Sequence, residues 1–559
     1  MSVTPEPNVA GAADPRRPGP TLAAPSAVLD SAHVGDIKGA FGTIRLGETG
    51  DRRSLKQRLL TFAAILGPGL IVMVGDNDAG GVATYSQAGQ NYGYSLLWVL
   101  VLLIPVLVVN QEMVVRLGAV TGVGHARLIN ERFGRGWGWF SVGDLFALNF
   151  LTIATEFIGI GLAAGYIGVS RYIVVPVAAA ALIAITASGS FARWERAMFV
   201  FIVITVVQVP LLLLSHPQWG SAAKHFVVPG IQGGVSSGAI LLIIAIVGTT
   251  VAPWQLFFQQ SNIIDKRITP RFISYERADT VLGSIVVVLG AAALMIAATY
   301  AATGTGQSGH FTDAGGIARL LGTHSHFLGA MFAILLMDAS IIGAAAVTLS
   351  TSYAFGDMFN MRHSLHRGFR EAKQFYATFT GLVVFAAAIV LIPGAPLGLI
   401  TTSVQALAGL LLPSASVFLL LLCNDREVLG PWVNKSWLNL LAAFIIGVLL
   451  LLSGVLMATT LFPTLNVTNV SEYLAITFVG LGGLAAGGLR IASRRGRAGP
   501  MPEPAFSVGD KMNWRMPPLA LLKPVKWSPG LKLGMLALRA YLVISAVLLV
   551  VKAIQLGTR

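Results

Sequence analysis

Charged residues are scarce in this sequence: only 11% of its 559 residues are Asp, Glu, Lys or Arg. Soluble globular chains carry about 25% charged residues. The hydrophobic share is 55% and the mean hydropathy is +0.73, so apolar residues dominate almost the whole chain. A single core in water does not grow much beyond roughly 250–300 residues. This composition excludes an ordinary soluble enzyme and a disordered protein, and it indicates a membrane protein with many spans.

Cysteine is almost absent as well. The single Cys423 cannot form an internal disulfide, and a cage of thiolates around a metal is excluded. No phosphate loop, zinc signature or pairing of a nucleophile with a base accompanies the apolar blocks, so we expect no enzyme activity. The net charge of +14 has two interpretations, binding to nucleic acid or contact with anionic lipid at the membrane surface. In a membrane protein, basic residues more often face the cytoplasm and anionic lipid, so we expect lipid and no nucleic acid as partner.

Long apolar blocks are plentiful, and most reach the roughly 20 residues that a membrane helix needs. No extended alternation of the outer-membrane barrel type occurs. The sequence therefore predicts an all-α polytopic membrane protein with about 12 spans. These lie near residues 59–88, 94–118, 140–168, 172–190, 196–215, 234–262, 278–302, 326–354, 374–392, 399–423, 436–460 and 471–490.

The segments outside these blocks complete the predicted organisation. Residues 1–57 are predicted to be a disordered cytoplasmic tail, 58–490 the transmembrane core and 491–534 a cytoplasmic linker. The last segment, 535–559, is an apolar helix. Its residues 535–556 have two open interpretations, a thirteenth span with snorkelling basic residues or a helix lying along the membrane surface.

The basic residues of the loops predict the orientation. Loops rich in Lys and Arg alternate strictly with loops that hold only Arg171, Lys224 and Arg319. Because cytoplasmic loops are the basic ones, the N-terminus and the region after residue 490 are predicted to be cytoplasmic. We expect a multi-pass protein of the plasma membrane.

The first apolar block contains polar residues at its centre, in the sequence GDNDAGG. A helix in lipid should not carry Asp76, Asn77 and Asp78 there, because each charge costs about 2.5–3.5 kcal/mol on insertion scales. Gly80 and Gly81 are also poor helix formers. The sequence therefore predicts an interrupted helix whose free carbonyls and carboxylates face a cavity. Capping of the second half of the helix by Asp76 is the structural alternative.

The sixth block contains Pro253 at its centre, and proline removes a backbone donor and clashes one turn back. The carbonyls around Thr249, Thr250 and Val251 should lose their partners. Two interrupted helices in corresponding halves of a membrane protein indicate a transport site. Carbonyl and carboxylate oxygens suit Mg²⁺, Ca²⁺ or Mn²⁺. A simple packing kink beside a solvated vestibule, or a site for an organic amine, are the alternatives.

These motifs resemble the Nramp family of divalent-metal transporters from about residue 59 to 460. The family's Asp-Pro-Gly-Asn motif falls on Asp78-Ala79-Gly80-Gly81, and its Met-Pro-His motif falls on Ala252-Pro253-Trp254. Gln405 matches a glutamine that helps to line the family's metal site. The resemblance implies a LeuT-like fold of two inverted five-helix repeats with the metal bound between spans one and six. It also implies a transporter, expected to be a monomer, whose metal ion is cargo and which needs no cofactor.

The departures from the family motifs predict the ion. Gly81 replaces an amide and Ala252 replaces a thioether, which should remove soft sulfur and make room. Asp76 and Asn77 add oxygen ligands. Because Mg²⁺ keeps several of its waters, a larger site with oxygen ligands alone favours partly hydrated Mg²⁺. We therefore expect a metal site formed by Asp78, Asp76, Asn77, Gly81, Val251, Ala252 and Gln405.

The residues that move protons in the family are also changed. Trp254 stands at the position of the histidine, and of the carboxylate pair in the third span only Glu156 remains, with Ile153 at the other position. Neither indole nor isoleucine carries a proton at neutral pH. We expect weak or no proton coupling, with Glu156 and Trp254 as a proton path or gate. In these features the chain resembles the Nramp-related magnesium transporters; proton-coupled transport of Mn²⁺ or Fe²⁺ is the alternative.

Overall fold

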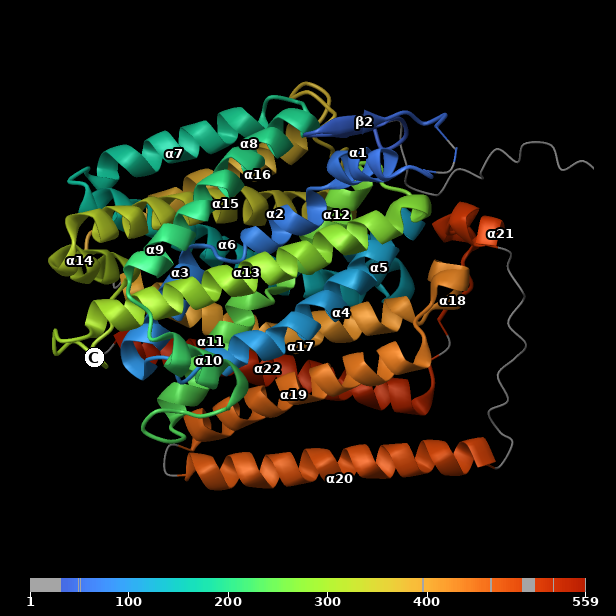
Figure 1. Ribbon diagram of the computed structural model, residues 1–559. Coiled ribbons are helices and arrows are strands. Elements are labelled where there is room, and N and C mark those ends of the chain that lie inside the picture. Colours follow the sequence, from blue (N-terminus) through green and yellow to red (C-terminus); the bar gives the residue numbers. More distant parts are fainter. Residues whose placement is uncertain are drawn as a thin grey trace, which may run out of the picture.

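The computed structural model describes residues 32–48, 50, 52–394, 397–462, 465–494, 508–525 and 527–557. Helices make up most of them, and they run side by side in one bundle (Figure 1). The elements before the second broken helix are β1 (Ile37–Gly39), β2 (Gly42–Ile44), α1 (Leu55–Ile65), α2 (Pro68–Val74), α3 (Ala79–Tyr92), α4 (Leu97–Thr121), α5 (His125–Phe133), α6 (Arg135–Tyr166), α7 (Arg171–Thr186), α8 (Phe191–Ile204), η1 (Thr205–Val207), α9 (Gln208–Leu214) and α10 (Trp219–Val227).

The remaining elements begin with the broken helix and end near the C-terminus. They are α11 (Ser237–Thr250), α12 (Pro253–Asp265), η2 (Pro270–Phe272), α13 (Ile273–Ala302), α14 (Ala314–His324), α15 (His326–Met358), α16 (Lys373–Val390), α17 (Leu397–Cys423), α18 (Arg426–Leu429), η3 (Gly430–Trp432), α19 (Ser436–Leu461), α20 (Val467–Arg494), α21 (Val508–Asn513), η4 (Leu519–Leu521) and α22 (Pro529–Gly557).

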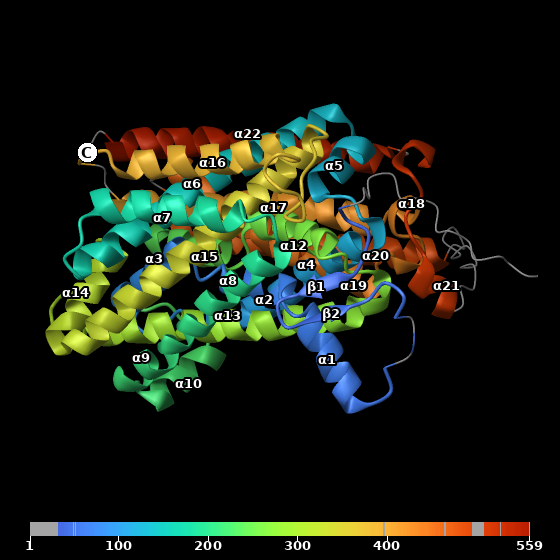
Figure 2. The ribbon, with the colours of Figure 1, turned by 90° about the horizontal axis from the view of Figure 1, so that it is seen from above.

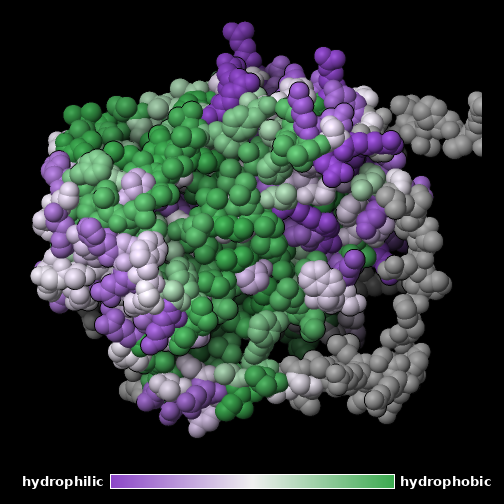
Figure 3. Space-filling view, in the orientation of Figure 1, coloured by the Kyte–Doolittle hydropathy of each residue, from purple (hydrophilic) through white to green (hydrophobic). Residues whose placement is uncertain are grey.

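Among the described residues, nine helices are long and apolar enough to cross a membrane, or ten spans if α1 and α2 count together as one bent span. This confirms the all-α membrane architecture, while 12 or 13 spans and inverted repeats stay predictions. α22 packs against α17 and α19, and the Tyr541 hydroxyl donates to the Leu410 carbonyl of α17. Green, apolar residues cover a broad central area of the surface in Figure 3, with hydrophilic residues gathered toward the ends of the helices.

The centre of the bundle is formed by the broken helices and their neighbours. α3 packs against α13, α11 against α17, and α12 against α4 and α15. α6 and α15 lie along one another and complete the wall beside α3. A view from above shows α4, α12, α13, α15 and α17 side by side, with α14 at one end and α9 and α10 at one edge (Figure 2). The two breaks are thus held inside protein, where exposed backbone is tolerated in a membrane.

The first predicted span contains a sharp bend before its polar break. α1 and α2 are bent by 52° relative to one another, so the block from residue 59 is not one straight helix. Gly67 forms the bend with φ +151°, and a Cβ there would lie 2.2 Å from a Glu195 carboxylate oxygen. Asp279 accepts hydrogen bonds from the backbone N–H groups of Gly67, Gly69 and Leu70, which satisfies donors that the start of α2 leaves free. This long-range cap fixes the bend, and hydropathy alone does not reveal it.

The prediction of a disordered tail up to residue 57 is wrong for residues 32–48. β1 and β2 form an antiparallel hairpin in which Ile37 and Ile44 are buried. The hairpin contacts α1 and α8, and the Arg267 guanidinium donates to the Ala32 carbonyl. The hairpin was missed because its strands have three residues each and its support comes from distant parts of the chain. Residues 1–31 and most of the predicted linker before residue 508 lie outside the described residues.

Candidate metal site

The first predicted break is present between α2 and α3. The helix ends at Val74, and the N–H groups of Asp76 and Asn77 bond back to the carbonyls of Met73 and Val74, both at 3.2 Å, in a tight turn. Asp78 then caps α3, because its carboxylate accepts from the Gly81 N–H at 2.7 Å. The cap is therefore Asp78, and the alternative role considered for Asp76 is wrong.

The second predicted break is present between α11 and α12. α11 ends at Thr250, and Pro253 is the first residue of α12, where its missing N–H costs nothing. The Gln255 side chain donates to the freed Thr250 carbonyl at 3.2 Å and accepts from Gln111 of α4 at 2.8 Å. Gln255 thus repairs part of the break, while Val251 and Ala252 connect the two half-helices.

Glu156 lies beside Asp78 at the start of α3. One Glu156 oxygen accepts from the Ala79 N–H at 3.0 Å, and the two carboxyl groups are within hydrogen-bonding reach of one another. Gly343 of α15 makes this possible, because a Cβ there would lie 2.6 Å from Glu156 and 2.8 Å from the Asp78 side chain. The structure therefore brings together two of the predicted residues from different spans.

Buried oxygens without hydrogen-bond partners gather around the two breaks. Both carboxylate oxygens of Asp76, one oxygen of Glu156 and the Thr249 hydroxyl have no partner in good hydrogen-bond geometry, although the Gln255 amide lies close enough to Asp76 to interact with it. Buried polar groups are nearly always paired, and an unpaired charged group in protein is costly. Asp76 and Asp78 are also close enough for their charges to interact. A positive ion beside these oxygens would supply the partner that the protein leaves out, so the arrangement suits a cation.

Gln405 and Trp254 border the same region. Gln405 on α17 is buried, its amide nitrogen has no partner, and it occupies the space beside Gly80. Trp254 on α12 is buried against Phe258, with its ring edge beside Gly75. An indole in this place forms a wall and offers no oxygen or ring lone pair to a metal.

The expectation that Gly81 makes room is wrong in this structure. A Cβ at Gly81 would lie 2.6 Å from the Asp76 carbonyl oxygen and 3.2 Å from the Thr249 hydroxyl. The space that a side chain would need is therefore filled by backbone. Asp76, Asp78, Glu156 and Gln405 are all buried, so the region is closed to solvent.

The Asn77 side chain makes contact with α13. Its amide nitrogen donates to the Val287 carbonyl of α13 at 3.1 Å, and it contacts Gly290 of the same helix. Its side-chain oxygen has no partner. The Asn77 nitrogen therefore ties the turn to α13, which the sequence pattern did not indicate.

The site differs from a resident metal centre. Across the residues that the structure describes, no group of three or more His, Cys, Asp or Glu side chains is arranged to hold a metal. The available donors are two or three carboxylates supplemented by hydroxyl, amide and backbone oxygens. The Thr249 hydroxyl was missed by the sequence analysis, which considered only its carbonyl. The pair of threonines just before the break is the signal that could have identified it.

Comparison with known proteins identifies the family. The chain matches the model for natural resistance-associated macrophage protein-like proteins over residues 69–459, well over half of its length. The chain belongs to this family, the Nramp family. The matched range contains both breaks and all nine predicted site residues.

Individual relatives agree with this assignment. The Nramp chain is 26% identical over 412 residues to the divalent metal cation transporter MntH of Burkholderia ambifaria, covering 70% of this chain and 88% of the relative. It is 29% identical to MntH 1 of Pseudomonas aeruginosa over 412 residues, covering 70% and 90%. These relatives are named as divalent metal cation transporters, and this Nramp protein is a multi-pass membrane protein of the same transporter family.

A solved structure confirms the fold. A manganese transporter of Eremococcus coleocola superposes with a TM-score of 0.58 at 19% identity, covering 78% of this chain and 96% of the other. At this identity the likeness concerns the fold alone. It confirms that this Nramp chain has the architecture of a transporter of the family.

Proposed function

We propose that this Nramp protein carries a hard divalent cation through a site between the α2–α3 and α11–α12 breaks. The observation that supports the proposal is the set of buried, unpartnered oxygens of Asp76, Glu156 and Thr249 next to Asp78. A cation there gains ligands that the protein does not satisfy by itself. In the proposed cycle, helices move around this fixed site and open it to each side of the membrane in turn.

Mn²⁺ is the first candidate for the transported ion. The superposable transporter is described as a manganese transporter, and the curated relatives as divalent metal cation transporters. Oxygen ligands suit Mn²⁺ as well as Mg²⁺. The packing at Gly81 also removes one argument for a roomy site that would hold a largely hydrated ion.

Mg²⁺ is the second candidate, and the chemistry of the donors supports it. Ala252 and Trp254 supply neither sulfur nor imidazole, so the site lacks the softer ligands that favour transition metals. The site also lacks an imidazole, and Ile153, three residues before Glu156 on α6, carries no titratable group. Both features support transport with weak or no proton coupling. The metal gradient and the membrane potential would then drive uptake.

An ion panel in proteoliposomes tests both proposals. The full chain is reconstituted with a pH dye inside, and uptake of Mn²⁺, Mg²⁺ and Ca²⁺ is measured side by side. Asp78→Asn and Asp76→Asn should each abolish uptake, because a carboxamide keeps the shape of the ligand and loses its charge. Glu371→Gln is the matched control, since Glu371 is an exposed carboxylate in the loop before α16 and neutralising it removes one charge away from both breaks.

The outcomes separate the two ions and the coupling. Uptake of Mn²⁺ that excludes Mg²⁺ and acidifies the lumen supports the manganese candidate with proton coupling. Uptake of Mg²⁺ without acidification supports the magnesium candidate. Undiminished flux in Asp78→Asn rejects the site itself.

A further inference from the structure

A second cavity lies on the outer side of α4, away from the metal site. It has a volume of about 340 Å³ and lies between α4, α13 and α19, with residues of the chain after α18 and of α21 at its rim. α4 packs against both α13 and α19, so the cavity is the groove where the three helices diverge. It lies at the basic end of the bundle, which the loop charges predict to be cytoplasmic.

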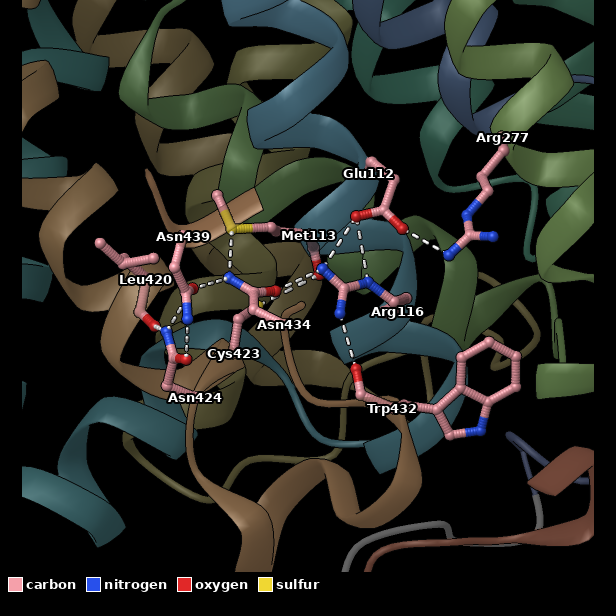
Figure 4. Close-up of polar contacts among 10 residues, drawn as sticks. All are labelled: Glu112, Met113, Arg116, Arg277, Leu420, Cys423, Asn424, Trp432, Asn434 and Asn439. Carbon is pink, nitrogen blue, oxygen red and sulfur yellow. Dashed lines mark hydrogen bonds and ion pairs between the residues drawn. The ribbon is translucent and has the colours of Figure 1, made fainter. Parts of the chain in front are cut away.

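The polar rim of the cavity is strongly basic. Arg116, Arg277, Lys435 and Lys511 line it together with a single carboxylate, Glu112, which leaves three positive charges in excess. Figure 4 shows how Glu112 is used: one oxygen pairs with Arg116 at 2.8 Å, and the other with Arg277.

Three of these basic side chains differ in how many of their N–H donors are already used within the protein. Arg116 also donates to the Trp432 carbonyl and to Asn434, both at 2.6 Å, so its guanidinium is fully engaged (Figure 4). Arg277 is 43% exposed, and its Nε is without a hydrogen-bond partner. Lys435 is exposed, and no ion pair is found for it within the described residues. The Glu112–Arg116 pair is thus held in place by its own hydrogen bonds at the base of the cavity. The exposed parts of the Arg277 and Lys435 side chains remain able to bind an anion.

The walls of the cavity are apolar and continue as exposed stripes toward the centre of the membrane. Val108, Val109 and Leu438 line the cavity. From Arg277, the exposed Val281 and Ile285 follow at four-residue steps along one face of α13. On α19 the exposed Trp437, Leu440 and Phe444 form a second stripe.

This combination fits one class of molecule. A tryptophan beside basic residues at the end of a membrane helix is typical of the headgroup level. Basic pockets between membrane helices on the cytoplasmic side bind lipid headgroups. We propose that the groove between α4, α13 and α19 binds an anionic glycerophospholipid, with its phosphate on Arg277 and Lys435 and its acyl chains along the two stripes.

Native mass spectrometry tests this site by measuring the binding of added lipid to the full-length protein in detergent. Dioleoyl phosphatidylglycerol should bind more tightly than dioleoyl phosphatidylcholine. The double variant Arg277→Gln/Lys435→Gln should weaken phosphatidylglycerol binding about 10- to 30-fold, since each basic residue near a lipid surface contributes on the order of a factor of five. Val108→Trp, which fills the cavity and keeps every charge, should weaken it as well.

The matched control is Arg370→Gln/Lys373→Gln, which removes two exposed charges at the start of α16. α16 packs against α6, α7 and α15, which are not walls of the groove. The proposal is overturned if the control weakens phosphatidylglycerol binding as much as the groove variant does. It is also overturned if Val108→Trp binds the lipid normally, or if inorganic phosphate in excess displaces it, which would indicate a site for a soluble anion.

Discussion

The Lys266 ammonium donates to the Glu195 carboxylate at 2.6 Å, and both side chains are completely buried. The same ammonium donates to the carbonyls of Ile65 and Leu66 at 2.7 and 2.8 Å. These carbonyls belong to the bend between α1 and α2, so the ion pair joins α8 and the end of α12 to the start of the first broken helix. Movement of α2 during transport has to break or carry along this connection.

Lys266→Met should destabilise the protein strongly. The substitution leaves the Glu195 carboxylate buried without its partner, which costs about 3–5 kcal/mol in comparable buried pairs. Thermal unfolding of the detergent-solubilised protein measures the loss. Lys373→Met, at an exposed position, should stay within about 0.5 kcal/mol of the wild type. Recovery in the double variant Lys266→Met/Glu195→Leu is expected, and equal midpoints for the two single variants would contradict the role of the pair.

Glu156→Gln should weaken metal binding without abolishing transport. The amide still accepts from the Ala79 N–H, but a negative charge beside Asp78 is lost. A neighbouring unit charge at an effective dielectric constant of about 20 contributes on the order of a few kcal/mol, so KM should rise tenfold or more. Any acidification of the lumen that accompanies transport should disappear as well. Glu371→Gln, at an exposed position before α16, should change neither quantity, and a Glu156→Gln variant with wild-type KM would show that Glu156 is only structural.

Gly81→Ala tests the close packing at the first break. The new methyl group would lie 2.6 Å from the Asp76 carbonyl, which belongs to the backbone and cannot rotate away. The turn must shift, at a cost of about 1–3 kcal/mol typical of overpacking, and uptake should fall at least tenfold. Gly143→Ala on α6 adds the same methyl group where nothing lies within 4 Å. Equal uptake by the two variants would mean that the turn is free to adjust.

The sequence predicted both breaks because their residues conflict with a helix in lipid. The local signals are two carboxylates and a glycine pair at residues 76–81 in one span, and Pro253 in the other. These residues are unfavourable in any continuous helix within a membrane. The unpartnered oxygens of Asp76 fit the role predicted for it. Trp254 likewise lies where a wall was expected.

The sequence failed where the decisive contact is distant. Asn77 was predicted as a metal ligand, and its oxygen stays a candidate, but nothing in the sequence indicated that its nitrogen binds the Val287 carbonyl, 210 residues away. The effect of Gly81 depends on how near the Asp76 carbonyl comes, which composition cannot tell. The bend at Gly67 needs Asp279 and Lys266, and the hairpin of residues 32–48 needs Arg267. Such contacts follow from the packing of the whole bundle.

His363, after the end of α15, provides a pH-dependent contact outside the membrane spans. Burial by itself would lower the pKa of His363, but the hydrogen bond and the charge of Asp357 outweigh burial and raise its pKa above the ordinary value. The ring lies 3.3 Å from the Asp357 carboxylate, and its other nitrogen contacts the Met361 carbonyl. Asp265 adds to the shift, and the His33 ring is 6.0 Å away.

A histidine with a raised pKa in the folded state stabilises the protein in its protonated form. That contribution is complete below about pH 6.5, the ordinary value, and it is lost as the pH rises through the raised pKa. The difference in unfolding temperature between the wild type and His363→Gln should therefore be largest in mildly acidic buffer and shrink toward alkaline pH. His310→Gln, in an exposed loop, should show no such trend. A difference that stays constant or grows with pH would mean that Asp357 does not hold His363 in its charged form.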